Sequence, residues 1–221
     1  MSSIRLPSLI CMLAALAAGT ARVEAHPHVF AEARLDVMLK PDGHTVDALR
    51  HLWRFDEVFS STVVLEFDKN GDNKLDDAEL ASVRQTVYDS LGEYNYFQLV
   101  TANGKDVAMQ KPDEFVALFD NNQLIIMFQA QPKEPLELSG TVDFGVYDST
   151  FYTAIDFLED DQMAVNPLPA GCSRKVVRPD PDEIIAQNQQ SLTEAFLSDP
   201  AGNDMSRIFA TRLELTCPAQ G

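Results

Sequence analysis

The stretch "VFAEARLDVML" at residues 29–39 decides the fold, because apolar and polar residues alternate along it. A period of two is typical of a β-strand with one buried face. "PDG" at 41–43 is a turn signal, so "HTVDALRHLWRF" (44–55) is predicted to return antiparallel. In a simple hairpin His28 would pair near Phe55, which leaves His51 four residues away, roughly 13 Å at strand rise.

Three further segments are predicted to complete a β-rich body. "NG" at 103–104 and "DNN" at 120–122 mark hairpin turns. "QLIIMFQAQ" (123–131) and residues 140–157 are rich in β-branched and aromatic residues, which is typical of core strands. Residues 207–217 are predicted to form a last strand. These strands would form an antiparallel sheet or a sandwich.

Two helical regions interrupt this pattern. Residues 56–91 read as helix, acidic loop and helix, and residues 180–197 as a C-terminal helix with Asp180 as its cap and Pro181 in its first position. The acidic, proline-containing segment 158–180 is predicted to be loop. The fold class is therefore α+β, an antiparallel β-rich body with an inserted EF-hand-like helix–loop–helix and a C-terminal helix.

The first 25 residues have the layout of an export signal. Arg5 gives a positive start, "LICMLAALAAG" (9–19) is a short apolar run, and "VEA" (23–25) ends in small residues suited to signal peptidase. Cleavage after Ala18 or Ala21 is an alternative. Residues 1–25 are predicted to be a signal peptide and 26–221 a single periplasmic domain.

Cys172 and Cys217 are the cysteines that remain after the predicted cleavage. An even number of cysteines in an oxidising compartment predicts a disulfide between them. A metal site that uses both thiolates is the alternative, but no CxxC spacing supports it.

The formal net charge of −17 excludes two classes of partner. Nucleic acids and anionic membranes bind basic surfaces, so neither is expected here. The sequence also contains no phosphate-binding glycine loop, no H-E-x-x-H pattern and no recognisable hydrolase motif.

The acidic loop "DKNGDNKLDDAE" (68–79) is the clearest motif of the chain. A calcium loop requires oxygen ligands at positions 1, 3, 5, 9 and 12 and a backbone carbonyl at position 7. The turn position normally held by glycine is Asn73, which tolerates a left-handed backbone. An acidic turn without metal is the alternative. The predicted ligands are Asp68, Asn70, Asp72, Lys74 through its carbonyl, Asp76 and Glu79.

Two histidines lie at the predicted mature N-terminus. If cleavage follows Ala25, the free amine and the ring of His26 can chelate one metal ion, and His28 adds a third nitrogen. Such nitrogen sets suit Zn²⁺, Ni²⁺, Co²⁺ and Cu²⁺. Pro27 has no N–H to lose, which blocks binding through deprotonated backbone amides. The alternative is a polar terminus that binds nothing.

Other candidate ligands are weaker. His51 is the next candidate for the transition metal, whereas His44 lies beside the turn and is interpreted as a solvated loop residue. A carboxylate could come from Asp143, Asp148 or Asp156, but the sequence does not place any of them near His26.

Three stretches together resemble one family. They are "AHPHVFAEARLDV" (25–37), "HLWRFDEVFS" (51–60) and "VYDSTFYTAI" (146–155). In this order they are similar to the ZevA-like periplasmic family, the periplasmic component of an uncharacterised transport system. Its members are associated with NicO-type nickel/cobalt permeases and with zinc or nickel acquisition. The resemblance maps onto His26, His28, His51, Trp53, Phe55 and Asp56. Of these, Trp53 and Phe55 are expected to pack and Asp56 to cap the following helix.

The resemblance implies a non-enzymatic function. The expected protein is a periplasmic component that binds zinc or nickel/cobalt, works with a NicO-type membrane permease and carries a structural calcium site. One alternative is a copper oxygenase with an N-terminal histidine brace, for which His51 or His44 would be the distant partner. The other alternative is a calcium-stabilised interaction module that binds no transition metal.

Overall fold

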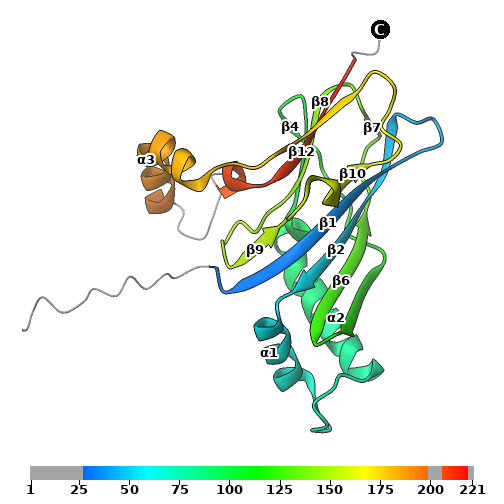
Figure 1. Ribbon diagram of the computed structural model, residues 1–221, viewed down its shortest axis with the longest axis vertical. Coiled ribbons are helices and arrows are strands. Elements are labelled where there is room, and N and C mark those ends of the chain that lie inside the picture. The colour runs from blue at the N-terminus through cyan, green and yellow to red at the C-terminus, as the bar shows by residue number, and fades with distance from the viewer. Residues whose placement is uncertain (1–26, 199–205, 219–221) are drawn as a thin grey trace, which may run out of the picture.

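The protein consists of two β-sheets and three α-helices, as seen in the computed structural model, which describes residues 27–198 and 206–218 (Figure 1). The predicted signal peptide and His26 lie outside these residues. A seven-stranded sheet has the strand order β10-β1-β2-β6-β5, with β7 beside β2 and β9 beside β1. A five-stranded sheet has the order β11-β12-β8-β3-β4. The predicted α+β class, a β-rich body with a helix–loop–helix insert and a C-terminal helix, is confirmed.

The first two strands form the long hairpin that the alternating pattern predicts. In β1 (Val29–Leu39) every second residue from Val29 to Val37 is buried, and β2 (Thr45–Phe55) runs antiparallel to it. The predicted register was wrong, because Ala31, not His28, pairs with Phe55. The ladder shifts between Met38 and Leu39, where β2 carries one extra residue. Such a bulge depends on local pairing geometry and leaves no mark in the apolar pattern.

The seven-stranded sheet extends from this hairpin on both sides. Strands β6 (Gln123–Ala130), β5 (Phe115–Asp120) and β7 (Leu136–Glu137) are antiparallel to their neighbours. Strands β9 (Thr153–Asp156) and β10 (Met163–Val165) instead pair parallel to β1. The sheet is therefore mixed, not purely antiparallel.

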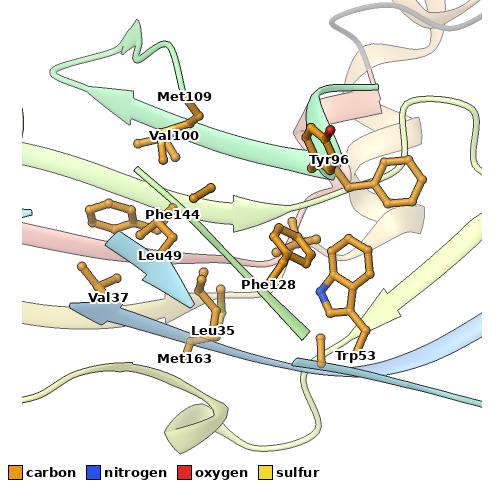
Figure 2. Packing of buried hydrophobic residues seen from close by; sticks show 14 of the residues in the cluster. Leu35, Val37, Leu49, Trp53, Tyr96, Val100, Met109, Phe128, Phe144 and Met163 are labelled. Atoms are coloured by element: carbon orange, nitrogen blue, oxygen red, sulfur yellow. The ribbon is translucent and has the colours of Figure 1, made fainter. Parts of the chain in front are cut away.

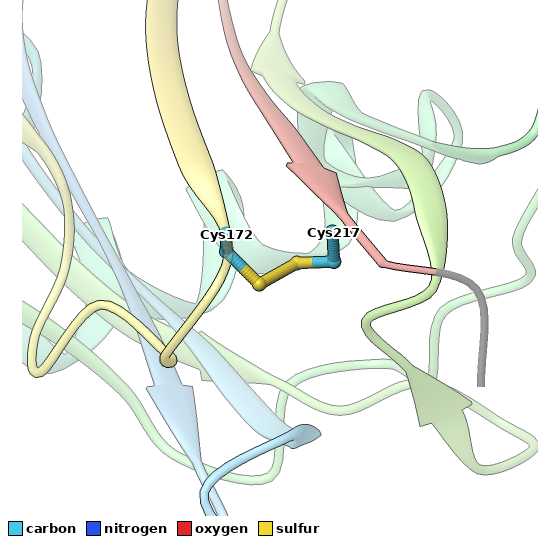
Figure 3. Close-up of a disulfide and its surroundings, with 2 residues drawn as sticks. All are labelled: Cys172 and Cys217. Atoms are coloured by element: carbon cyan, nitrogen blue, oxygen red, sulfur yellow. A yellow bond between two sulfur atoms is a disulfide. The ribbon is translucent and has the colours of Figure 1, made fainter.

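The five-stranded sheet is antiparallel throughout. It consists of β3 (Gln98–Ala102), β4 (Lys105–Asp106), β8 (Gly140–Val146), β11 (Ser173–Val177) and β12 (Arg212–Cys217). The predicted disulfide is confirmed, since Cys172 and Cys217 are joined by an S–S bond of 2.04 Å (Figure 3). It lies directly beyond the paired residues Ser173 and Thr216, so it fastens β11 to β12.

The prediction that 158–180 is loop was wrong in two places, because the segment contains β10 and β11. β10 has only three residues. β11 is a polar strand whose first three residues are exposed. Neither has enough apolar periodicity to be recognised in isolation. Pairing with β1 and with β12 stabilises them as strands.

One hydrophobic core contains side chains from both sheets. Figure 2 shows Leu35, Leu49 and Trp53 of the hairpin in the same cluster as Val100 and Phe144 of the second sheet. Trp53 is 1% exposed and Phe55 is buried, so both pack as predicted.

The helices occupy the positions that the sequence predicts. The insert consists of α1 (Glu57–Phe67) and α2 (Asp77–Gly92), and α3 (Pro181–Ser198) follows β11. Asp180 caps α3, because its carboxylate accepts hydrogen bonds from the N–H groups of Asp182 and Glu183. Short 3₁₀ turns lie at Asn95–Phe97, Asp160–Gln162 and Ser206–Phe209. Along residues 27–198 and 206–218, no helix has the length and apolar character needed to cross a membrane.

Candidate metal sites

Asp56 fixes the position of the helix–loop–helix insert against the first strand. One carboxylate oxygen accepts a hydrogen bond from Phe59 N–H at 2.9 Å, which caps α1. The other accepts from Phe30 N–H at 3.0 Å, at the start of β1. Asp56 therefore caps α1, as the sequence predicts. It also ties α1 to β1, the strand that begins directly after His28.

The carboxylate and amide groups of the acidic loop turn inward and bind its own backbone. Asp68 accepts from the N–H groups of Gly71 and Asn73, each at 2.7 Å. Asn70 accepts from Asp72 N–H, and Asp72 from Lys74 N–H, both at 2.9 Å. Since every carboxylate has further lone pairs, these bonds orient the loop oxygens without using up their capacity as ligands.

Glu79 closes the loop from the first turn of α2. Its two carboxylate oxygens accept from Lys69 N–H at 2.8 Å and from Asp76 N–H at 2.9 Å, and its side chain is buried. Asp76 in turn caps α2 by accepting from the N–H groups of Ala78 and Glu79, which completes a capping box. Position 12 of the loop is thus held against the backbone next to position 1, because Lys69 follows Asp68.

The loop backbone adopts the turn that the pattern requires. Asn73 has a φ of 61° and Gly71 a φ of 77°, both in the left-handed region. Leu75, at position 8 of the loop, packs against the hydrophobic core. The left-handed backbone that the sequence predicts at Asn73 is confirmed.

The loop carboxylates are not gathered around one point. In the described part of the chain no group of three or more His, Cys, Asp or Glu side chains is placed to hold a metal ion. The donor set of carboxylate, amide and carbonyl oxygens is the kind that Ca²⁺ prefers, and the turn already has the required shape.

His28 lies at the start of β1 with its side chain exposed. Its backbone N–H donates to the carbonyl of Tyr152 at 2.9 Å, and the rings of these two residues lie 5.2 Å apart. His26 lies outside the described residues. The structure therefore places one of the two N-terminal histidines, at the surface beside the turn that leads into β9.

His51 lies in the hydrophobic core, away from His28. It is 0% exposed, and its ring stacks on Phe128 with the centroids 4.5 Å apart. His51 pairs with Leu35, seven residues along β1 from His28, or about 23 Å at strand rise. The expected separation of about four residues was wrong because of the shifted register, and the structure does not bring these two histidines together.

Burial controls the protonation of His51. Removal from water lowers its pKa to about 3, and the nearby Gln98 side chain opposes this shift. Neither ring nitrogen has a hydrogen-bond partner of good geometry among the described residues. The imidazole is therefore neutral at physiological pH.

His44 is a turn residue, as predicted. Its backbone N–H donates to the carboxylate of Asp42 at 2.9 Å, and its side chain is 41% exposed. Hydrogen bonds from the backbone of His44 and Thr45 lower the pKa of Asp42 to about 2. His44 thus stabilises the β1–β2 turn, at the opposite end of the hairpin from His28.

The three candidate carboxylates have separate environments. Asp143 accepts from the Thr101 hydroxyl and faces Arg212. Asp156 pairs with Glu32 between β9 and β1. Asp148 accepts from the Thr150 N–H and hydroxyl and from the Thr153 N–H, and thereby holds the turn next to His28.

The local sequence pattern does not indicate that this turn, residues 148–153, lies beside His28. Thr153 pairs with Val29, and the Tyr152 carbonyl accepts from both His28 and Val29. One sequence feature could have suggested this proximity, because "VYDSTFYTAI" (146–155) and the N-terminal stretch carry the same family resemblance. Parallel pairing of β9 with β1 brings the two stretches together.

The fold and the loop define a β-rich protein of two facing sheets with a helix–loop–helix insert. The chain belongs to the family described as "Protein of unknown function (DUF1007)", which matches residues 11–217. A Spirochaeta aurantia protein, "Uncharacterized 15.5 kDa protein in trpE 3'region", is 26% identical over 136 residues, which cover 62% of this chain and 97% of that protein. An "Uncharacterized protein" of Haemophilus influenzae is 23% identical over 198 residues, covering 88% of this chain and 92% of the relative.

Proposed function

We propose that this protein is a periplasmic metal-binding component of ZevA-like type that works with a NicO-type membrane permease. It binds Ca²⁺ in the loop 68–79 and a transition metal, zinc or nickel/cobalt, at its N-terminus. The observation that carries the proposal is the loop, in which the ligand pattern, the left-handed turn and the capping box occur together. The disulfide is consistent with an oxidising compartment.

Calcium has a structural role in this proposal. The oxygens that would hold it belong to Asp68, Asn70, Asp72, Asp76 and Glu79, together with the carbonyl of Lys74. A bound cation neutralises the repulsion within the loop and fixes the end of α1 to the start of α2. Because both helices pack on the core, calcium is expected to stabilise the whole fold.

The transition metal is proposed to bind at His26 and His28. The exposed ring of His28 at the start of β1 supports this assignment, as does the family resemblance of the N-terminal stretch. His51 is buried on β2 and pairs with Leu35, seven residues along β1 from His28, so its role in this proposal is packing. Delivery of the metal to a permease requires reversible binding and no chemistry on the ion.

A histidine-brace oxygenase is less well supported by the described residues. Such an enzyme needs a second histidine beside the N-terminal one. His51 is enclosed by aromatic rings, and His44 lies at the opposite end of the hairpin. The positions of these two side chains favour a carrier.

Calcium binding is tested by calorimetric titration of Ca²⁺ into the wild type and into Glu79→Gln. The variant should bind calcium at least about tenfold more weakly, equivalent to about 1.4 kcal/mol. Asp77→Asn is the matched control, because Asp77 is an acidic residue of the same helix turn that lies outside the ligand pattern. Equal affinities of the wild type and Glu79→Gln would contradict the calcium proposal.

The N-terminal site is tested by titration of Zn²⁺, Ni²⁺ and Co²⁺ into two forms of the protein. One begins at His26 and the other has an extra glycine before it. A loss of affinity of about tenfold on adding the glycine would identify the free amine as a ligand. His28→Ala should weaken binding and His44→Ala should not. Absence of binding by the form that begins at His26 would refute the carrier function.

A further inference from the structure

A hollow lies between α1 and α2, and its lining contains none of the proposed metal ligands. It has a volume of about 530 Å³, within the range of sites that bind ligands or anchoring side chains. Its floor is apolar and comes from the start of β1, the end of β2, the 3₁₀ turn and β6. The floor residues are Val29, Phe55, Phe97 and Leu124.

The walls of the hollow are two rows of apolar side chains at helical spacing. Phe59, Val63 and Phe67 form the row on α1, and Val83, Val87 and Leu91 form the row on α2. In each row the residues are four positions apart, so each row covers about 12 Å of helix. The hollow is therefore an elongated groove that follows two helices.

Polar residues form an accessible rim above these walls. Thr62 and Glu66 lie on the α1 side, and Thr86 and Ser90 on the α2 side, and all four are exposed. At one end stand Tyr94, 42% exposed, and Tyr152, 50% exposed. An open rim with an apolar floor can admit the side chains of a peptide while its backbone stays in solvent.

The charge around the groove selects the kind of partner. The charged side chains of its lining are Glu66, which is exposed, and Asp148, which is buried and accepts hydrogen bonds from three neutral donors. The basic residues of 57–93 are Lys69, Lys74 and Arg84, and none of them lines the groove. Outside the loop 68–79, which holds the proposed calcium ligands, Arg84 is the basic residue of this segment and the acidic residues outnumber it: Glu57, Glu66, Asp89 and Glu93.

We propose that this groove, bounded by α1 and α2, docks a cationic amphipathic helix of a partner protein. Apolar side chains of the partner, repeated every three or four residues on one face, fill the space between the two rows. Lysine or arginine residues beside that face meet the Glu66 carboxylate on the rim. This mode of recognition uses helical spacing on both sides of the interface.

The test uses a fluorescently labelled peptide of about 14 leucine and lysine residues, in which the leucines share one helical face. Fluorescence anisotropy is measured with the full exported chain in saturating calcium at about 0.15 M salt, where long-range attraction between charges is screened. A scrambled peptide of the same composition has no apolar face. The structured peptide should bind at least about tenfold more tightly than the scrambled one.

Two neighbouring substitutions on α2 separate the groove from general charge. Thr86→Lys places a cation on the rim, whereas Gln85→Lys adds the same charge at an exposed residue that does not line the groove. Both positions are exposed, so both variants should fold. Thr86→Lys should weaken peptide binding about tenfold or more, and Gln85→Lys by less than about twofold.

Several outcomes would overturn the proposal. These are no binding of the structured peptide, equal binding of the scrambled peptide, and equal losses in the two lysine variants. Sedimentation that reveals a dimer broken by Thr86→Lys alone would assign the groove to a second copy of the chain. Binding of the neutral dye N-phenyl-1-naphthylamine that the peptide fails to displace would assign it to a small apolar ligand. No transition metal is present, so these results are independent of the N-terminal site.

Discussion

At the scale of single residues, Asp56 joins two elements through one carboxylate. It caps α1 through Phe59 N–H and holds the start of β1 through Phe30 N–H. Asp56→Ala removes both hydrogen bonds and should lower the free energy of unfolding by about 2 kcal/mol. Chemical denaturation measures this loss. Asp47→Ala removes an exposed aspartate of β2 and should change stability by less than about 0.5 kcal/mol. Equal effects of the two substitutions would show that the cap is unimportant.

His51 makes stability depend on pH. Its pKa is lowered to about 3 in the folded chain, from an ordinary value of 6.5, so the unfolded chain binds the proton more readily. The stability that the neutral ring contributes is fully present above about pH 6.5 and is lost as pH falls towards 3. The loss reaches up to about 1.4 kcal/mol per pH unit within this window.

The prediction is tested by His51→Leu, which removes the titrating group and keeps an apolar side chain in the core. The free energy of unfolding, measured from about pH 7 to pH 4.5, should fall less steeply in this variant than in the wild type. His44→Asn removes a half-buried turn histidine and should leave the wild-type slope unchanged. Identical slopes in the wild type and His51→Leu would mean that His51 is not held neutral by burial.

At the scale of elements, the disulfide holds an otherwise weak edge strand. β11 has a polar sequence, and its fixed neighbours are β12 and the bond between Cys172 and Cys217. The two cysteines are 45 positions apart, so loss of the cross-link should cost about 4 kcal/mol in the chain-entropy view. Thermal unfolding of the Cys172→Ser, Cys217→Ser double variant measures this loss.

The control for this prediction is chemical. A reducing agent should lower the melting temperature of the wild type to that of the double variant and should not affect the variant itself. A wild type that melts at the same temperature with and without reductant would show that the bond contributes nothing to stability.

Elements with a strong local pattern were predictable from the sequence. Alternation predicted β1, the turn residues at 41–43 predicted the hairpin, and the caps Asp56 and Asp180 predicted the starts of α1 and α3. The strands β10 and β11 were missed because pairing partners distant in the sequence stabilise them. The register of the hairpin was missed because it depends on the length of the turn between Lys40 and Thr45 and on a one-residue bulge, and no residue type marks either.

The loop 68–79 and the groove between α1 and α2 differ in how far they could be predicted from the sequence. The conformation of the loop 68–79 follows from consecutive residues, so its left-handed turn at Asn73 could be predicted. The groove draws its lining from the starts or ends of several separate elements between Val29 and Thr153. Only the tertiary fold brings these segments together. For the same reason the burial of His51 could not be read from its neighbours in the chain.

At the scale of the whole molecule, the shared core should make the two sheets unfold together. Buried residues of both sheets belong to one cluster, and Trp53, the single tryptophan of the chain, lies inside it. Trp53 fluorescence and far-ultraviolet circular dichroism should therefore follow the same transition in denaturant. Two separate midpoints would contradict a common core.

The strand order of the five-stranded sheet has a consequence for biogenesis. Among the described residues β12 follows all the other strands in sequence, yet it lies between β11 and β8 and not at an edge. A polypeptide emerges from the ribosome or a translocase with its N-terminus first. Until residues 212–217 are released, the backbone of β8 presents an unsatisfied edge that can template pairing with other chains. During synthesis the protein is thus vulnerable to aggregation until residues 212–217 have emerged, and a holdase chaperone would protect it best in this interval.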